Sequence, residues 1–448
     1  MTGLEQQRPG SADEAKQGTD VTGGGRRELW WAEASIWTDR MVSALGNGVT
    51  GGKWFSLIDK VFRPSTLEAA WRSVARNKGA AGVDRMSVER FAAREARYLH
   101  ELHTQLKEGS YQPHPVKRVE IPKGDGKTRP LGIPAVKDRV VQAALKMVIE
   151  PIFETRFRPG SFGFRPGRGC KDALREVDRL IREGFTHVVD ADLKGYFDTI
   201  PHERLMTLVA GSISDGRVLA LIELFLKQDI VSESARWTPV AGTPQGAVLS
   251  PLLANLYLHP LDCMMADNGF EMVRYADDFV ILCRTAEDAR TALSRVKAWV
   301  DANGLTLHPD KTHVGDCSQP GQGFEFLGYR FEAGQRRVRQ KSLNSLKDRI
   351  RGRTGRSRGD SLGRIISDLN PVLRGWFGYF KHARPALVVF RMIDKMVRRR
   401  LRAVLRKQEK RPGVGRSKAD HIRWPNVFFA KQELFTLTTA LSTARHSR

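Results

Sequence analysis

Three aspartates are the residues best suited to chemistry. Asp277 and Asp278 stand side by side in RYADDFVIL (274–282), and Asp192 follows an apolar run in VVDADLKGYFDTI (188–200). The pattern predicts two short strands joined by a tight turn at the pair, and another strand over 186–193. Because neighbouring carboxylates repel each other, such a pair is costly without a bound cation. If the strands adjoin, the carboxylates predict a site for two Mg²⁺ ions, which clamp the oxygens of a phosphoryl transfer.

Other readings of these and nearby residues are weaker. The aspartate pair alone could be a surface turn, where Asp is common. His308 and His313 have no Cys or His partner at zinc spacing, and the four cysteines are far apart with no CxxC pair. A zinc ribbon and a disulfide scaffold are therefore excluded.

The elements around the aspartates predict an α+β fold with a mostly antiparallel sheet. Apolar residues at helical spacing predict a helix over 137–157. A capping box at Thr285 and Asp288 predicts a helix that ends at Gly304. The remaining expectations are helices over 65–108, β structure over 116–122 and 324–331, and a mainly helical last quarter.

Positive charge gathers at the end of the 448-residue chain, whose net charge is +24. Residues 341–448 hold 27 Lys and Arg against 7 Asp and Glu. A helix is predicted after Pro385, with a basic face that includes Arg391, Lys395, Arg398 and Arg402. The excess favours a polyanionic partner such as nucleic acid over a solvated basic tail, because the region keeps helical apolar periodicity.

No run of 18 or more apolar residues is present, and the first residues lack the apolar stretch of a secretory signal. We therefore expect no membrane partner and a location in a bacterial cytoplasm.

An ordered set of motifs resembles the bacterial group II intron-encoded reverse transcriptase/maturase family. The blocks are IPKGDGKTRPLGIP (121–134), DRVVQAAL (138–145), SFGFRPGRG (161–169), DADLKGYFDTI (190–200), GTPQGAVLSPLLANLYLHPLD (242–262), RYADDFVIL (274–282), GLTLHPDKT (304–312), FEFLGYRF (324–331), LNPVLRGWFGYF (369–380) and RWPNVFFAKQELFTL (423–437). The resemblance covers about residues 50–440 and implies a right-hand polymerase.

This resemblance implies a division of the chain into four parts. They are a flexible N-terminal segment (1–45), fingers and palm (46–331, with core motifs over 104–331), a helical thumb or maturase X domain (340–418), and a short C-terminal nucleic-acid-binding element (419–448). Larger family members end in a Cys-rich HNH-type endonuclease, and the lack of cysteine after Cys317 leads us to expect the small form without it.

The resemblance also implies roles for single residues. Asp192, Asp277 and Asp278 match the catalytic, metal-binding carboxylates. Lys123 and Arg129 match basic residues at the triphosphate, although both could be exposed turn residues. Phe197 matches the bulky side chain that crowds a ribose 2′-OH, although it could be plain core. Gln245 matches a glutamine near the incoming nucleotide, and Lys311 is expected to support the metal centre or a phosphate.

The implied function is RNA-directed DNA synthesis, with binding of group II intron RNA, assistance to splicing and support of intron mobility. The implied partners are the intron RNA, an RNA template with a DNA primer, dNTPs and target DNA. Two alternatives stay open: a domesticated or defence-associated reverse transcriptase that serves no intron, and an RNA-binding splicing factor without polymerase activity.

Overall fold

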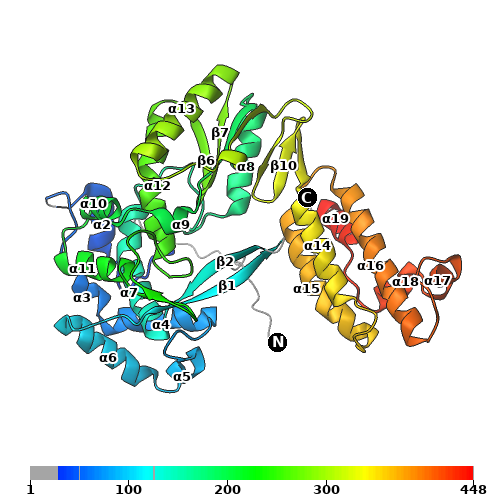
Figure 1. Ribbon diagram of the computed structural model, residues 1–448, viewed down its shortest axis with the longest axis horizontal. Coiled ribbons are helices and arrows are strands. Elements are labelled where there is room, and N and C mark those ends of the chain that lie inside the picture. Colours follow the sequence, from blue (N-terminus) through cyan, green and yellow to red (C-terminus); the bar gives the residue numbers. More distant parts are fainter. Residues whose placement is uncertain (1–28, 50, 125–126, 447–448) are drawn as a thin grey trace. The chain divides into compact units, whose positions relative to one another are not determined.

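The computed structural model describes residues 29–49, 51–124 and 127–446 (Figure 1). It is an α+β structure, as predicted, and divides into two compact units. The first contains the residues up to Gly169, Asp192–Asp277 and Leu293–Pro309, and the second contains Cys170–Ala191, Asp278–Ala292 and the residues from Asp310 onward. Within the described residues, no helix is both long and apolar enough to cross a membrane.

The first unit is mainly helical and is built around α7 (Val136–Glu154). Val141, Leu145, Val148 and Ile152 recur at helical spacing and are at most 3% exposed, which confirms the predicted helix. Its other helices are α2 (Asp39–Asn47), α3 (Ile58–Val61), α4 (Pro64–Asn77), α5 (Val88–Ala92), α6 (Glu95–Glu108), α9 (Tyr196–Thr199), α10 (His202–Ala210), α11 (Gly216–Leu226) and α12 (Ser250–Asp267).

The start of this unit corrects one sequence-based boundary. Ile36 and Trp37 are each 1% exposed, and the Trp37 Nε1 donates to the Met147 carbonyl at 3.1 Å. The predicted flexible segment 1–45 therefore extends too far, because these apolar residues join the core. Residues 1–28 of that segment lie outside the described part.

A long hairpin forms the main β structure of the first unit (Figure 1). Strand β1 (Val116–Gly124) pairs antiparallel with β2 (Lys127–Ile133), and Ile121 lies opposite Arg129. The short strands β4 (Ile230–Val231) and β5 (Arg236–Trp237) complete a sheet of order β2-β1-β4-β5.

A second four-stranded sheet carries the predicted aspartates and has the order β6-β7-β3-β8. Its strands are β6 (Glu271–Tyr275), β7 (Asp278–Cys283), β3 (His187–Asp192) and β8 (His313–Asp316). Strand β3 pairs antiparallel with β8, as predicted for this sheet. Helix α13 (Ala286–Ala302) follows β7, and the Asp288 N–H donates to the Thr285 Oγ1 as its predicted cap requires.

The second unit holds the last quarter of the chain. Helices α14 (Gln340–Arg353), α15 (Leu362–Phe380) and α16 (Ala386–Gln408) lie side by side, and α19 (Leu437–His446) packs on α15 and α16 (Figure 1). Burial of each large apolar side chain along α16 contributes about 1.5–3 kcal/mol. The other elements are α8 (Cys170–Arg182), η1 (Pro309–Lys311), β9 (Phe324–Phe326), β10 (Tyr329–Glu332), β11 (Gln335–Val338), α17 (Lys418–Arg423) and α18 (Asn426–Lys431).

The aromatic block at the end of α15 joins these helices to the sheet β11-β10-β9. The Tyr329 hydroxyl donates to the Tyr379 carbonyl at 2.5 Å, and the Tyr379 hydroxyl donates to the Leu327 carbonyl at 2.7 Å. This part of the GWFGYF block is therefore used for internal packing.

The C-terminal segment is anchored on the same helices. The Asn370 amide bonds the backbone at Glu433 and Phe435, and the Asp394 carboxylate accepts from the N–H groups of Leu437 and Thr438. Residues 433–438 of the predicted element 419–448 are thus fixed on α15 and α16.

Candidate functional site

Asp192 is the last residue of β3, and hydrogen bonds to the segment around His308 fix the backbone there. The His308 N–H donates to the Asp192 carbonyl at 2.7 Å, and the Lys194 N–H donates to the Thr306 carbonyl at 2.8 Å. The preceding Ala191 is fully buried, whereas Asp192 is half-buried. The strand end therefore presents a carboxylate at the edge of the core, with its main chain fixed.

Asp277 lies in the turn between β6 and β7, and Asp278 is the first residue of β7, in the hairpin that the sequence predicts. Both are half-buried. The residue before them, Ala276, has a φ of 61°. For a residue with a Cβ atom this left-handed conformation costs about 1–2 kcal/mol, so the surrounding contacts must hold it.

The block SFGF (161–164) supplies part of that support. The Arg274 N–H donates to the Gly160 carbonyl at 2.9 Å, and the Phe162 N–H donates to the Arg274 carbonyl at 2.8 Å. A Cβ atom on Gly163 would come within 2.2 Å of the Ala276 nitrogen. Glycine is required at 163 because the two main chains touch there.

Tyr196 connects the segment after Asp192 to α12. It is buried four residues after Asp192, and its hydroxyl donates to the Ala254 carbonyl of α12 at 2.5 Å. Burial raises the pKa of Tyr196 well above its ordinary value, Arg274 opposes this, and the negative charge of Asp277 adds to it. The hydroxyl bond therefore fixes the segment that follows Asp192 on α12.

The metal-binding role of the three aspartates stays a prediction. Across residues 29–49, 51–124 and 127–446, no group of three or more His, Cys, Asp or Glu side chains is arranged to hold a metal ion. The donor chemistry of Asp192 and Asp277 nevertheless suits Mg²⁺, which takes one or two carboxylates and keeps several waters.

The loop that contains Gln245 is tied to both sides of the predicted nucleotide site. The Thr243 N–H donates to the Phe197 carbonyl at 2.6 Å, and the Gly132 N–H donates to the Gln245 carbonyl at 2.6 Å. A Cβ atom on Gly246 would lie 2.3 Å from the Gly132 carbonyl oxygen. The structure thus brings the backbones of Phe197, Gln245 and β2 together.

The side chains assigned to nucleotide binding differ in exposure. Phe197 is half-buried, with its ring 6.4 Å from that of Phe164. Arg129 is exposed on β2, and Lys311 is exposed at the end of η1 in the second unit. Lys123 lies in β1, but its side chain falls outside the described residues.

The predicted basic face of α16 needs one correction. Arg391 and Lys395 are exposed and Arg398 is half-buried, but Arg402 is 2% exposed. The Arg402 guanidinium donates to the Trp424 carbonyl and the Asn426 Oδ1, and it stacks over the Phe429 ring at 5.4 Å. Arg402 was therefore wrongly placed on the exposed face: it fastens the C-terminal segment to α16.

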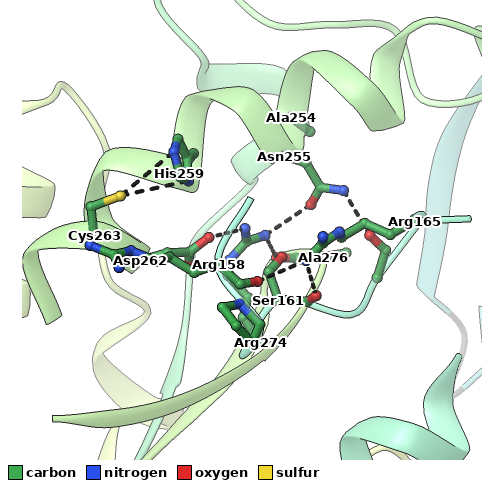
Figure 2. Close-up of polar contacts among 12 residues, drawn as sticks. Arg158, Ser161, Arg165, Ala254, Asn255, His259, Asp262, Cys263, Arg274 and Ala276 are labelled. Atoms are coloured by element: carbon green, nitrogen blue, oxygen red, sulfur yellow. Dashed lines mark hydrogen bonds and ion pairs between the residues drawn. The ribbon is translucent and has the colours of Figure 1, made fainter. Parts of the chain in front are cut away.

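Three further residues at the turn were missed by the sequence analysis. Arg274, Asn255 and Asp262 are at most 5% exposed and bond one another beneath Ala276 (Figure 2). The available signal was a charged residue inside the apolar strand before the aspartate pair. Asn255 and Asp262, seven residues apart on α12, were a second signal, because this spacing places both on one helix face.

Two family models match the chain. Residues 121–331 match the reverse transcriptase (RNA-dependent DNA polymerase) model, and residues 343–424 match the group II intron, maturase-specific domain. Protein YkfC of Escherichia coli (strain K12) is 34% identical over 61% of this chain and 82% of that protein. The chain belongs to the group II intron-encoded reverse transcriptase/maturase family.

Other relatives of this reverse transcriptase/maturase are themselves intron-associated by name. The group II intron-encoded protein LtrA of Lactococcus lactis subsp. cremoris is 38% identical over 46% of this chain and 35% of its own length. An uncharacterized 91 kDa protein in the cob intron of Schizosaccharomyces pombe is 41% identical over 35% of this chain and 19% of its own length. The chain thus spans about a third of LtrA.

Membership in this reverse transcriptase/maturase family confirms the predicted right-hand polymerase fold and enzyme class. The chain is an RNA-directed DNA polymerase, and hence a nucleotidyltransferase, with a maturase role. Reverse transcriptases use divalent metal ions and nucleic-acid substrates, and the maturase domain adds RNA binding. The two alternatives, a reverse transcriptase that serves no intron and a splicing factor without polymerase activity, are not favoured.

Proposed function

We propose that this reverse transcriptase uses Asp192, Asp277 and Asp278 as ligands for two Mg²⁺ ions. Bound Mg²⁺ would neutralise the charge that develops on the attacking and leaving oxygens during nucleotide addition. The carboxylates would hold the ions, and the fixed backbone around Asp192 would keep the primer end and the nucleotide aligned.

One observation carries this proposal: β3, which ends at Asp192, and β7, which begins at Asp278, are neighbouring strands of one sheet. The predicted ligands therefore lie on two adjacent strands and in the turn that leads into one of them. Carboxylates gathered at a strand end and a tight turn form a site that favours a hard cation with oxygen ligands.

The surrounding residues would select and orient the nucleotide. Lys123 and Arg129 would contact the triphosphate, and Gln245 would lie near the base and sugar. Phe197 would crowd a ribose 2′-OH, an assignment supported by its half-buried ring and by its backbone link to Thr243. Lys311 would support the metal centre or a phosphate.

The exposed charges of α16 would bind RNA outside the chemical site. Arg391, Lys395 and Arg398 recur at helical spacing, and no ion-pair partner is found for them within the described residues. Such a row suits the phosphates of a folded RNA. We propose that the chain uses it to bind its own group II intron RNA, to assist splicing and to support insertion into target DNA, in a bacterial cytoplasm.

Primer extension on an RNA template with Mg²⁺ and dNTPs tests the assignment. Asp277→Ala should lower the rate by at least about 10³-fold, because transition-state charge loses part of its stabilisation. The matched control is Asp301→Ala, which removes an exposed carboxylate of the same unit. Binding of intron RNA should be unchanged in both variants. Extension by Asp277→Ala at the control rate would rule out the metal assignment.

A further inference from the structure

Arg274 is the most deeply buried charge next to the turn at Ala276, Asp277 and Asp278, which we call the aspartate turn. It lies on β6, three residues before Asp277, and is 0% exposed. A buried guanidinium destabilises a fold unless its donors find acceptors, so its surroundings indicate why it is present.

Its donors reach three different partners (Figure 2). Nε and Nη2 donate to the two carboxylate oxygens of Asp262 at 2.7 and 2.5 Å, which is the bidentate fork that Arg forms with a carboxylate. Nη1 donates to the Asn255 Oδ1 at 2.9 Å and to the Ala276 carbonyl at 2.8 Å. The last bond fixes the peptide plane that leads directly into Asp277.

Asn255 extends the network to the other side of the turn. Its Nδ2 donates to the Gly163 carbonyl at 2.7 Å, and Gly163 is the residue whose backbone touches Ala276. The neighbouring Ala254 accepts the Tyr196 hydroxyl. Consecutive residues of α12 therefore hold the segment that follows Asp192 and the contact beneath the aspartate turn.

We infer that Arg274, with Asn255 and Asp262, is a positioning group that sets the location of Asp277 relative to Asp192 and thereby tunes divalent-metal affinity and nucleotide addition. The inference rests on the proposed metal role of these aspartates. Arg274 touches no reacting atom: it acts through the Ala276 carbonyl. Lysine cannot replace it, because one ammonium cannot make the fork and the Ala276 bond in the same planar geometry.

The test compares three variants, Arg274→Lys, Asn255→Ala and Asp262→Asn, with two matched controls. Arg139→Lys changes another buried arginine of the first unit, which donates to the Ala80 carbonyl. Asp215→Asn, the control for Asp262→Asn, changes a buried carboxylate that accepts hydrogen bonds from the backbone N–H groups of Leu57, Ile58, Arg217 and Val218. Thermal unfolding measures the structural cost in every variant.

The decisive readouts are the metal dependence and kcat. For the three test variants, the Mn²⁺ concentration that half-saturates binding, followed by electron paramagnetic resonance without substrates, should rise by about tenfold or more. The value of kcat for dNTP addition should fall by about 10–100-fold, while the Kd for template–primer stays at the parent value. The controls should lose thermal stability only.

Two results would overturn the inference. The first is that Arg274→Lys binds Mn²⁺ and adds nucleotides as Arg139→Lys does. The second applies if Arg274→Lys does not fold: Asn255→Ala, which keeps the Arg274–Asp262 pair, would reject the positioning role if its Mn²⁺ affinity and kcat equalled those of the parent. Failure of the underlying metal proposal is distinguishable, because Asp277→Ala would then retain activity and the Mn²⁺ affinity of the parent.

Discussion

The aspartate turn and the helix α16 both carry closely spaced charges, but they use them in opposite ways. At the turn, Arg274 is completely enclosed and its donors bind Asp262, Asn255 and the main chain. Along α16, Arg391 and Lys395 face outward, whereas Arg402 is enclosed like Arg274. A basic side chain stabilises the fold where a neighbouring element offers hydrogen-bond acceptors. Where no element does so, the side chain stays available to a ligand.

The largest expected effect concerns Asp192. Asp192→Asn keeps the shape of the side chain but removes its charge, so primer extension should fall by at least about 10³-fold. The thermal unfolding temperature should stay the same or rise, because repulsion among neighbouring carboxylates is relieved. A variant that unfolds early would indicate a structural role for Asp192 instead.

The second prediction separates two arginines of one helix. Arg402→Ala should lower the free energy of unfolding by about 2–3 kcal/mol, because the carbonyl of the buried Trp424 and the Asn426 side chain lose their charged donor. Arg391→Ala should change it by less than about 0.5 kcal/mol, as surface substitutions usually do. Urea unfolding of the two variants measures the difference. Equal free energies of unfolding would contradict a structural role for Arg402 that Arg391 lacks.

The third prediction concerns the charges available to RNA. The triple variant Arg391→Gln, Lys395→Gln, Arg398→Gln keeps helix propensity. If each cation meets one phosphate, the log–log salt slope for intron RNA binding becomes shallower by about 2–3 units. Splicing assistance should weaken, while addition of a single nucleotide at saturating substrate persists.

A control with the same loss of charge tests whether the position matters. Arg72, Arg76 and Arg90 are exposed in the first unit, and their replacement by Gln should leave the salt slope near the parent value. Equal changes in both triple variants would point to unspecific attraction rather than to the α16 surface.

The smallest expected effect is on sugar selection. Phe197→Ala should raise the efficiency of ribonucleotide relative to deoxyribonucleotide incorporation by roughly tenfold, because the space beside the 2′ position opens. The measurement is the ratio of kcat/KM for the two nucleotides, with the exposed Phe55→Ala as control. An unchanged ratio would assign the Phe197 ring to packing alone.

Local patterns in the sequence were sufficient to predict much of the fold. The helix around Val141, the strand that ends at Asp192, the hairpin at Asp277 and the cap at Thr285 all depend on periodicity or short-range chemistry. The buried face of α16 was also predictable, since Phe390, Ile393, Val397 and Leu401 recur at helical spacing.

Partners that are distant in the sequence were not predictable in this way. Helical spacing placed Arg402 in line with Arg391, but Trp424 and Phe429 return from 22 and more residues later and bury it. The early boundary of the first unit was wrong for the same reason, because Trp37 packs against α7 more than a hundred residues away.

The sequence by itself determined the chemistry of this protein: an aspartate pair on a hairpin, a third aspartate on a strand, and a basic last quarter. Only the tertiary structure decided which polar groups hold that chemistry in place. Arg274, Asn255 and Asp262 acquire a role because α12 packs against the strand before the turn, where a buried guanidinium must satisfy its donors. That demand depends on burial, which arises only when distant segments meet.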